Sequence, residues 1–284
     1  MPQGILAKPL TLNRTDLDIL CVLSLKGYRF LTCHHLKLLY FAAEADCMKR
    51  MTELCEMGLT ARLFTPTSDV QKQEAIYTLT RFGARQLAIL KGISSLGLAS
   101  TGKPSYLFLE HGLRVSDFMC SLEAATKPKG IKLACWKSER QLRSPRGRAL
   151  KIPHPFEAGD KISVIPDGLF SLEIDKRVEH FFLEADRGTM SLFTMRNKLL
   201  GYIQLYRRRL HQEHFNIPHF RVLLVTNTLY RINKLREILR KIGYCPNMFW
   251  FAVWKDISPE KILSKIWLKC REQEQYSFLE IKHK

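Results

Sequence analysis

The stretch IPDGLFSLEIDKRVEHFFLEAD, residues 165–186, decides the fold class. A turn signal at Pro166–Gly168 precedes an apolar run, and charged residues separate that run from a second one. Such runs predict a strand at Leu169–Ile174 and another at His180–Ala185. Acidic residues stand where these strands begin and end. The stretch therefore predicts a sheet with carboxylates gathered near one edge.

Helix and strand patterns alternate on both sides of this stretch, which predicts an α/β module over 105–284. Upstream we expect a helix at Leu113–Ala125 and strands at Ile131–Trp136 and Ile162–Ile165. Downstream the expected elements are a long helix over Leu192–His211, a strand at Arg221–Thr226, a helix at Tyr230–Ile242, a strand at Met248–Trp254 and an amphipathic helix over 258–273.

Residues 12–90 have a different pattern, which reads helix, helix, helix, hairpin, helix. The hairpin strands are expected at Ala61–Phe64 and Ala75–Leu79. Three helices and a β-wing predict a winged helix-turn-helix domain over 1–92. The Gly-, Ser- and Lys-rich residues that follow predict a linker over 93–104.

The chain is strongly basic, with a net charge of +18 over 284 residues. Residues 1–100 contribute only +4 of this charge, so the excess lies in the second module. Such an excess favours a polyanionic partner, and we expect DNA. We find no run of about 18 apolar residues and no signal-peptide pattern, which argues against a membrane protein. Eight scattered cysteines without a Cys-x-x-Cys pair suit free thiols in the cytoplasm.

Three acids carry the chemistry that this pattern suggests. Glu184 and Asp186 are two residues apart on a predicted strand, so both side chains point to one face. Asp167 faces them if the two strands pair. Converging carboxylates suit Mg²⁺ or Mn²⁺, which activates water and polarises phosphate. The alternative is structural: Asp-Gly favours turns by itself, and the acid pair could answer Arg187 or Arg196.

The same spacing resembles the restriction-endonuclease superfamily, whose motif is Pro-Asp followed by acid-x-Lys. The resemblance implies that Asp167 and Glu184 are metal ligands in a catalytic site that includes Asp186. Asp186 stands in the lysine's position, and Lys198 on the following helix is the candidate replacement. Glu139 is a candidate extra acid.

A second resemblance covers more of the chain. The segments HHLKLLY (34–40), YTLTRFGARQL (77–87), EHGLRVSDF (110–118) and LEADRGT (183–189) are similar to the replication-relaxation family. That family occurs on bacterial plasmids and other mobile elements, which implies a role in replication, relaxation or mobilisation.

Basic residues in three regions are candidates for DNA contact. The first region is the third helix, the second precedes the central strands, and the third is the last part of the long helix. The candidates are Lys49, Arg50, Arg140, Arg143, Arg146, Arg148, Arg207, Arg208 and Arg209. Acids share the third helix, so a role in protein contact or a homo-oligomer stays open. The leading hypothesis is a DNA-binding protein of a mobile element with a nuclease-like domain. Its alternatives are an active Mg²⁺-dependent endonuclease and a transcriptional regulator or scaffold with an inactive nuclease fold.

Overall fold

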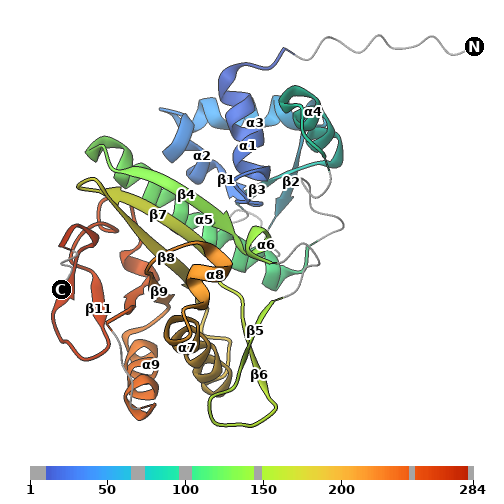
Figure 1. Cartoon of the computed structure of the whole chain (residues 1–284). Coiled ribbons are helices and arrows are strands. Elements are labelled where there is room, and N and C mark those ends of the chain that lie inside the picture. The colour runs from blue at the N-terminus through green and yellow to red at the C-terminus, as the bar shows by residue number, and fades with distance from the viewer. Residues whose placement is uncertain (1–10, 65–73, 96–103, 144–148, 243–246, 281–284) are drawn as a thin grey trace, which may run out of the picture. The chain divides into compact units, whose positions relative to one another are not determined.

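The structure is a computed structural model, and it describes residues 11–64, 74–95, 104–143, 149–242 and 247–280. Within these ranges the chain is a mixed α/β protein with nine α-helices and a seven-stranded sheet (Figure 1). The mixed α/β prediction is confirmed. The chain divides into two compact units, Met1–Gly112 and Leu113–Lys284, and the division falls inside helix α5 (Tyr106–Thr126). Most of the predicted linker, residues 96–103, lies outside the described residues.

The first unit packs helices around a small antiparallel sheet with strand order β1-β3-β2. Thr32 and Thr80 cap two of its helices by accepting hydrogen bonds from backbone N–H groups in the first turn. Its elements are α1 (Arg14–Ser24), β1 (Leu31–Thr32), α2 (Cys33–Tyr40), α3 (Glu44–Glu56), β2 (Thr60–Phe64), β3 (Ala75–Leu79) and α4 (Arg81–Lys91).

The second unit contains the seven-stranded sheet, in the order β12-β11-β10-β9-β8-β7-β4. β8, β9 and β10 run parallel, and their neighbours on either side are antiparallel. The elements are β4 (Lys132–Ser138), α6 (Glu139–Leu142), β5 (Leu150–Pro153), β6 (Lys161–Val164), β7 (Gly168–Ile174), β8 (Arg177–Ala185), α7 (Leu192–Arg207), α8 (Leu210–Phe215), β9 (Arg221–Thr226), α9 (Leu229–Lys241), β10 (Phe249–Val253), β11 (Trp267–Lys269) and β12 (Gln275–Tyr276).

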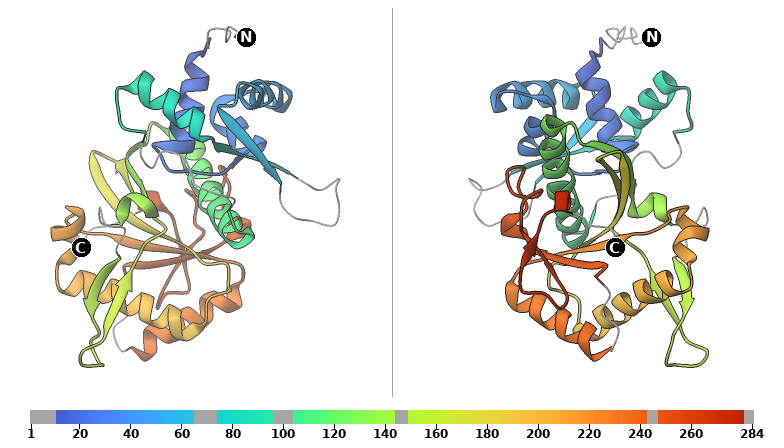
Figure 2. Two further views of the ribbon diagram at one scale, coloured as in Figure 1. Left: turned by 90° about the vertical axis from the view of Figure 1, so that its right-hand side faces the viewer. Right: turned by 60° about the vertical axis from the view of Figure 1, so that its left-hand side comes forward.

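Helices α7 and α9 cover one face of this sheet (Figure 2). Leu199 and Leu235 of these helices join Phe182, Leu224 and Phe251 of the strands in one buried apolar cluster. Burying such side chains contributes about 1.5–3 kcal/mol each before conformational entropy is counted. α7 is therefore held against β8. This packing determines which residues of α7 lie next to Glu184 near the end of β8.

The hairpin of β7 and β8 sets the register of the candidate site. Asp175 and Lys176 form its two-residue turn with φ of 49° and 64°, the left-handed conformation that matches the twist of paired strands. This turn pairs Gly168 with Leu183. Asp167, just before β7, is thereby brought beside Glu184.

Two glycines allow close approaches around this hairpin. A Cβ on Gly168 would lie 2.1 Å from the ring of Trp136 on β4. A Cβ on Gly201 of α7 would lie 2.6 Å from Val164 on β6. The glycine of the Asp-Gly pair at 167–168 thus allows the Trp136 ring of β4 to pack directly against β7. Gly201 allows the β5–β6 hairpin to lie directly against α7.

Two predicted helices differ in the structure. The helix predicted over 258–273 is wrong, because β11 forms within this range and pairs with β10 at the sheet. The Trp267 indole is buried and donates to the Ile262 carbonyl at 3.0 Å, so an apolar residue of the predicted helix is packed in a strand of the sheet. The helix predicted over 192–211 ends at Arg207, since Arg209 has a left-handed φ of 56°.

Cys270 is disulfide-bonded, so the expectation of free thiols is wrong at that residue.

Candidate active site

Glu184 is the centre of a buried polar cluster in the second unit. It lies near the end of β8, and its side chain is 3% exposed. The Tyr202 hydroxyl donates to Glu184 Oε1, and the Lys198 ammonium pairs with Oε2. Lys198 and Tyr202 are four residues apart on α7, so they lie on one face of that helix. Both oxygens of a buried carboxylate are therefore satisfied by one helix.

Asp167 approaches this cluster from the start of β7. Its Oδ2 accepts a hydrogen bond from the backbone N–H of Ala185 at 2.7 Å, and its own N–H donates to the Leu183 carbonyl at 3.0 Å. Glu139, at the start of α6, donates its backbone N–H to the Asp167 carbonyl at 3.1 Å. One carboxylate oxygen of Glu139 lies within 4.8 Å of one of Asp167. Three acids thus surround one lysine.

The electrostatics of the cluster reflect this crowding. Burial, with a smaller contribution from the Asp167 carboxylate, raises the pKa of Glu184 to about 7, while Lys198 opposes the shift. Burial alone would lower the pKa of Lys198, but Glu184 and Asp167 together hold it above its usual range. Lys198 therefore stays protonated at neutral pH. It is a fixed positive charge facing the acids.

Asp186 has different partners. Its Oδ2 accepts from Arg231 Nε at 2.9 Å and from the Thr226 hydroxyl at 3.0 Å, and its Oδ1 accepts from the Gly188 N–H at 3.0 Å. Arg231 belongs to α9 and was not a residue that the sequence pointed to. The structure brings Asp167, Glu184 and Lys198 together and leaves Asp186 in a separate ion pair.

The candidate DNA-contact residues fall into three groups. Lys49, Arg140 and Arg207–Arg209 are exposed. Arg143 pairs with Glu139 at 2.6 Å. Arg50 is held by the buried Asp16 and by Glu53. Arg146 and Arg148 lie outside the described residues.

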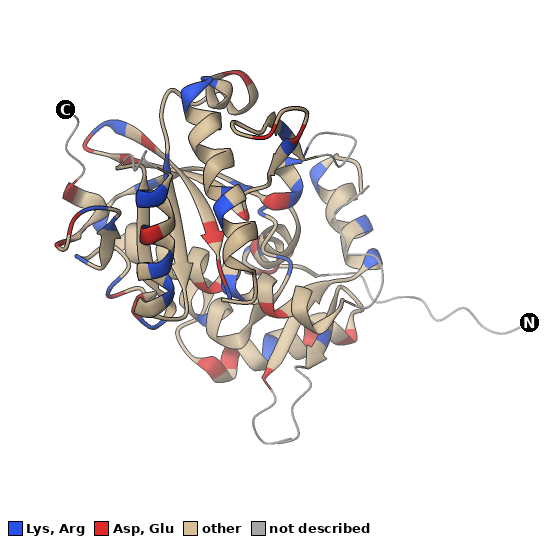
Figure 3. Ribbon diagram, turned by 90° about the horizontal axis from the view of Figure 1, so that it is seen from below, with Lys and Arg blue, Asp and Glu red and all other residues tan. Residues whose placement is uncertain are grey.

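Basic side chains of the second unit are spread over several elements. Figure 3 shows Lys and Arg positions on more than one helix, with acidic positions between them. Arg207, Arg208 and Arg209 are three consecutive arginines, and they occupy the break between α7 and α8. Within the described part of the chain, this break is the densest run of exposed basic residues, and the run contains no acidic residue.

Carboxylate oxygens at Asp167, Glu184 and Glu139 are hard donors of the kind that Mg²⁺ and Mn²⁺ take. A cation among them would relieve the repulsion that raises the pKa of Glu184. Lys198 adds a fixed positive charge beside these oxygens. Tyr202 adds a hydroxyl that holds Glu184 in place.

Comparisons with known proteins agree with the resemblance in the sequence. The family model described as Replication-relaxation matches residues 23–219, which is more than half of the chain and includes Asp167, Glu184 and Lys198. No curated protein and no solved structure matches. Among the described helices, none has both the length and the apolar character needed to cross a bilayer.

Proposed function

Because the chain belongs to the replication-relaxation family, we propose that it binds DNA in plasmid replication or relaxation and cleaves phosphodiester bonds at Asp167, Glu184 and Lys198. The observation that carries this proposal is the pairing of the Lys198 ammonium with the buried Glu184 carboxylate beside Asp167. Asp186 stands at the strand position where the nuclease motif has its lysine, and it is paired with Arg231. In the proposal Lys198, from the helix that follows, takes the role of that lysine.

Carboxylate oxygens of Asp167 and Glu139 lie within 4.8 Å of one another, close enough to share a divalent cation. In the proposal Asp167 and Glu184 hold the cation and Glu139 assists. Mg²⁺ or Mn²⁺, when bound, supplies the Lewis acid that phosphodiester hydrolysis uses. The Asp167 carboxylate adds to the effect of burial in raising the pKa of Glu184, and this repulsion between the acids favours a cation.

In the proposed reaction a water oxygen forms a bond to phosphorus and the bond to the sugar oxygen breaks. A proton from the water ends on the departing oxygen, which leaves a phosphate and a hydroxyl. Lys198 stays protonated, so its role is to orient the phosphate and offset its growing negative charge. Tyr202 fixes the Glu184 carboxylate while this occurs.

A plasmid-nicking assay tests this activity. Wild-type protein should convert supercoiled plasmid to the nicked form with Mg²⁺ or Mn²⁺, and Asp167→Asn should be at least about a hundredfold slower, since a lost cation interaction is worth several kcal/mol. Asparagine keeps an oxygen for the Ala185 N–H, so the fold should persist. Glu237→Gln, on the exposed side of α9, is the matched control. Equal rates for wild type and Asp167→Asn would leave a DNA-binding protein with an inactive nuclease fold.

The first unit supports the DNA-binding part of the proposal. Its order of helices and strands, with the sheet order β1-β3-β2, is typical of winged helices that place their third helix on DNA. Exposed Lys49 on α3 is a candidate contact, whereas Arg50 is engaged by Asp16. A homo-oligomer stays a prediction.

The arginines at the α7–α8 break give a second test. Arg207→Gln, Arg208→Gln and Arg209→Asn together should weaken DNA binding similarly for all sequences and lower the salt slope by about one per lost phosphate contact. Asparagine tolerates the left-handed backbone at residue 209. The control replaces three exposed lysines, Lys255, Lys261 and Lys265, with glutamine. Binding measured by fluorescence anisotropy that falls equally in both triple variants would contradict a role for this patch.

A further inference from the structure

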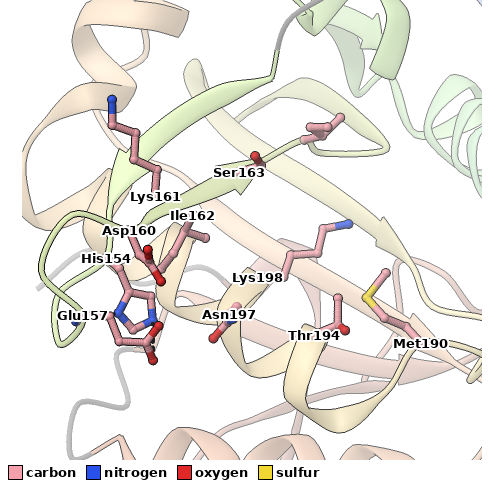
Figure 4. A pocket seen from close by; sticks show the side chains of 11 residues that line it. His154, Glu157, Asp160, Lys161, Ile162, Ser163, Met190, Thr194, Asn197 and Lys198 are labelled. Atoms are coloured by element: carbon pink, nitrogen blue, oxygen red, sulfur yellow. Dashed lines mark hydrogen bonds and ion pairs between the residues drawn. The ribbon is translucent and has the colours of Figure 1, made fainter.

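A cavity of about 350 Å³ lies between the β5–β6 hairpin and α7. Figure 4 shows His154 and Glu157 at one end, Asn197 in the middle, and Lys198 and Met190 at the other. Lys198 thus connects this cavity to the cluster around Glu184. The proposed cleavage site uses only that end, and the rest of the cavity has no assigned role.

Two residues that line this cavity each have a buried polar atom without a hydrogen-bond partner within the described part of the chain. The two atoms are His154 Nε2 and Asn197 Oδ1. The His154 side chain is 3% exposed, and the nearest acid, Glu157, is 3.8 Å away, beyond hydrogen-bond range. Unpaired buried groups are costly, so such a pair points to a ligand that satisfies both.

The protonation of His154 identifies what the ligand offers. His154 Nδ1 accepts hydrogen bonds from the backbone N–H groups of Phe156 at 3.3 Å and Glu157 at 3.0 Å. The ring proton of the neutral imidazole therefore lies on Nε2, which makes that atom a donor. Nε2 then cannot ligate a metal ion. The cavity requires an acceptor at His154 and a donor at Asn197.

This combination distinguishes between ligand classes. A phosphate group is a poor match for this end of the cavity, because the acids Glu157 and Asp160 would repel its negative charge. A nucleobase edge carries a donor and an acceptor side by side, and an asparagine amide is a frequent partner for such an edge. The cavity walls include Ile162, Ile165 and Met190, which suit the faces of a planar ring.

An exposed aromatic ring lies against His154, one of the residues that line the cavity. Phe156 is 65% exposed, and its ring meets that of His154 edge-on at 6.1 Å between centroids. The Arg196 guanidinium lies over the Phe156 ring at 6.0 Å. Exposed aromatic rings beside basic groups are typical stacking surfaces for unpaired bases.

We propose that this cavity binds one unpaired nucleobase of a DNA strand whose phosphate lies at Lys198. The placement of the phosphate rests on the proposed function. Bases inside a duplex are stacked and paired, so entry requires single-stranded DNA or an extruded nucleotide. The preferred substrate is therefore DNA that is single-stranded or locally opened.

Binding by the full chain in EDTA tests this without any cleavage. Fluorescence anisotropy compares a labelled single-stranded oligonucleotide with an abasic oligomer of equal length and charge. We expect the wild type to bind the base-bearing strand about tenfold more tightly or better. Asn197→Leu should reduce that affinity to the abasic level and leave abasic binding unchanged. Thr194→Phe, which fills the cavity from an exposed position, should do the same.

Asn233→Leu, the same change at an exposed position of α9, is the matched control and should keep the preference. Equal wild-type affinity for both strands overturns the base pocket and leaves backbone binding intact. A base preference that survives both cavity variants overturns it as well. Binding to neither strand contradicts the proposed DNA-binding function itself, so the two failures are distinguishable.

Discussion

Lys198→Met is expected to lower the free energy of unfolding by about 3–5 kcal/mol at pH 8, and by roughly 1 kcal/mol less at pH 5, because it leaves the buried Glu184 carboxylate without its cation. Burial already raises the pKa of Glu184 to about 7 in the wild type, above its ordinary 4.5. Without Lys198 this pKa rises further. The folded variant then holds a proton that the unfolded chain releases above pH 4.5.

The sign of the effect follows from this difference in bound protons. Between the unfolded and folded pKa values the native state binds more protons, so stability falls as pH rises. Lys198 has a folded pKa raised above 10.5, so its charged form stabilises the wild type throughout this window. Below pH 7 Glu184 holds its proton in both native states, so the gap between wild type and variant should stay nearly constant from pH 5 to pH 7 and widen above pH 7, where only the variant keeps the proton. Urea unfolding in EDTA, followed by circular dichroism, measures it.

The double variant Glu184→Gln, Lys198→Met supplies the control. It removes both charges and keeps a hydrogen-bonding group for Tyr202. Its stability should lack the steep pH dependence of the single variant. If Lys198→Met loses the same free energy at pH 5 and pH 8, the loss comes from packing, and the buried ion pair does not explain it.

Arg50→Ala is expected to destabilise the first unit by about 3–5 kcal/mol, since Asp16 is fully buried and would lose its partner. Arg50 Nε donates to Asp16 Oδ1 at 2.6 Å, and a second guanidinium nitrogen donates to Oδ2. Asp16 also closes the capping box of α1, where it accepts from the Asn13 N–H at 2.8 Å. One carboxylate thus joins the start of α1 to α3.

Lys49→Ala is the matched control, because Lys49 is the exposed neighbour on the same helix and its loss should change stability by no more than about 0.5 kcal/mol. Thermal unfolding of the full chain compares the two. A loss of DNA binding in Arg50→Ala alone would then report unfolding, whereas a loss in Lys49→Ala would report contact. An Arg50→Ala protein as stable as the Lys49→Ala protein would contradict the structural role of Arg50.

Much of the fold follows from local patterns. The apolar runs around residues 165–186 predict β7 and most of β8, because strand periodicity is a property of neighbouring residues. The expected helix over 258–273 is wrong because the pairing of β11 with β10 and β12 is a tertiary effect that overrides local spacing. Local patterns also give no sign that Arg209 interrupts a helix.

The site residues that are close in the sequence could be predicted, whereas the ion pairs between distant residues could not. Asp167 and Glu184 lie on one hairpin, and Lys198 follows shortly after, so sequence spacing could bring all three into consideration. The Asp186–Arg231 and Asp16–Arg50 pairs join residues far apart in the chain. Charge type alone offers many equivalent partners for such acids. Only the packed helices select between them.

β8 pairs with β7 through a short turn and with β9 through a long connection, and this difference affects the order of folding. β7 and β8 are joined by a two-residue turn, and isolated hairpins form in about 1–10 microseconds. β9 pairs with β8 only after the chain has passed through α7 and α8, and long-range parallel pairing is slow because loop closure must come first. We expect the acids of the hairpin to meet early in folding, and Lys198 to reach them only when this crossover closes.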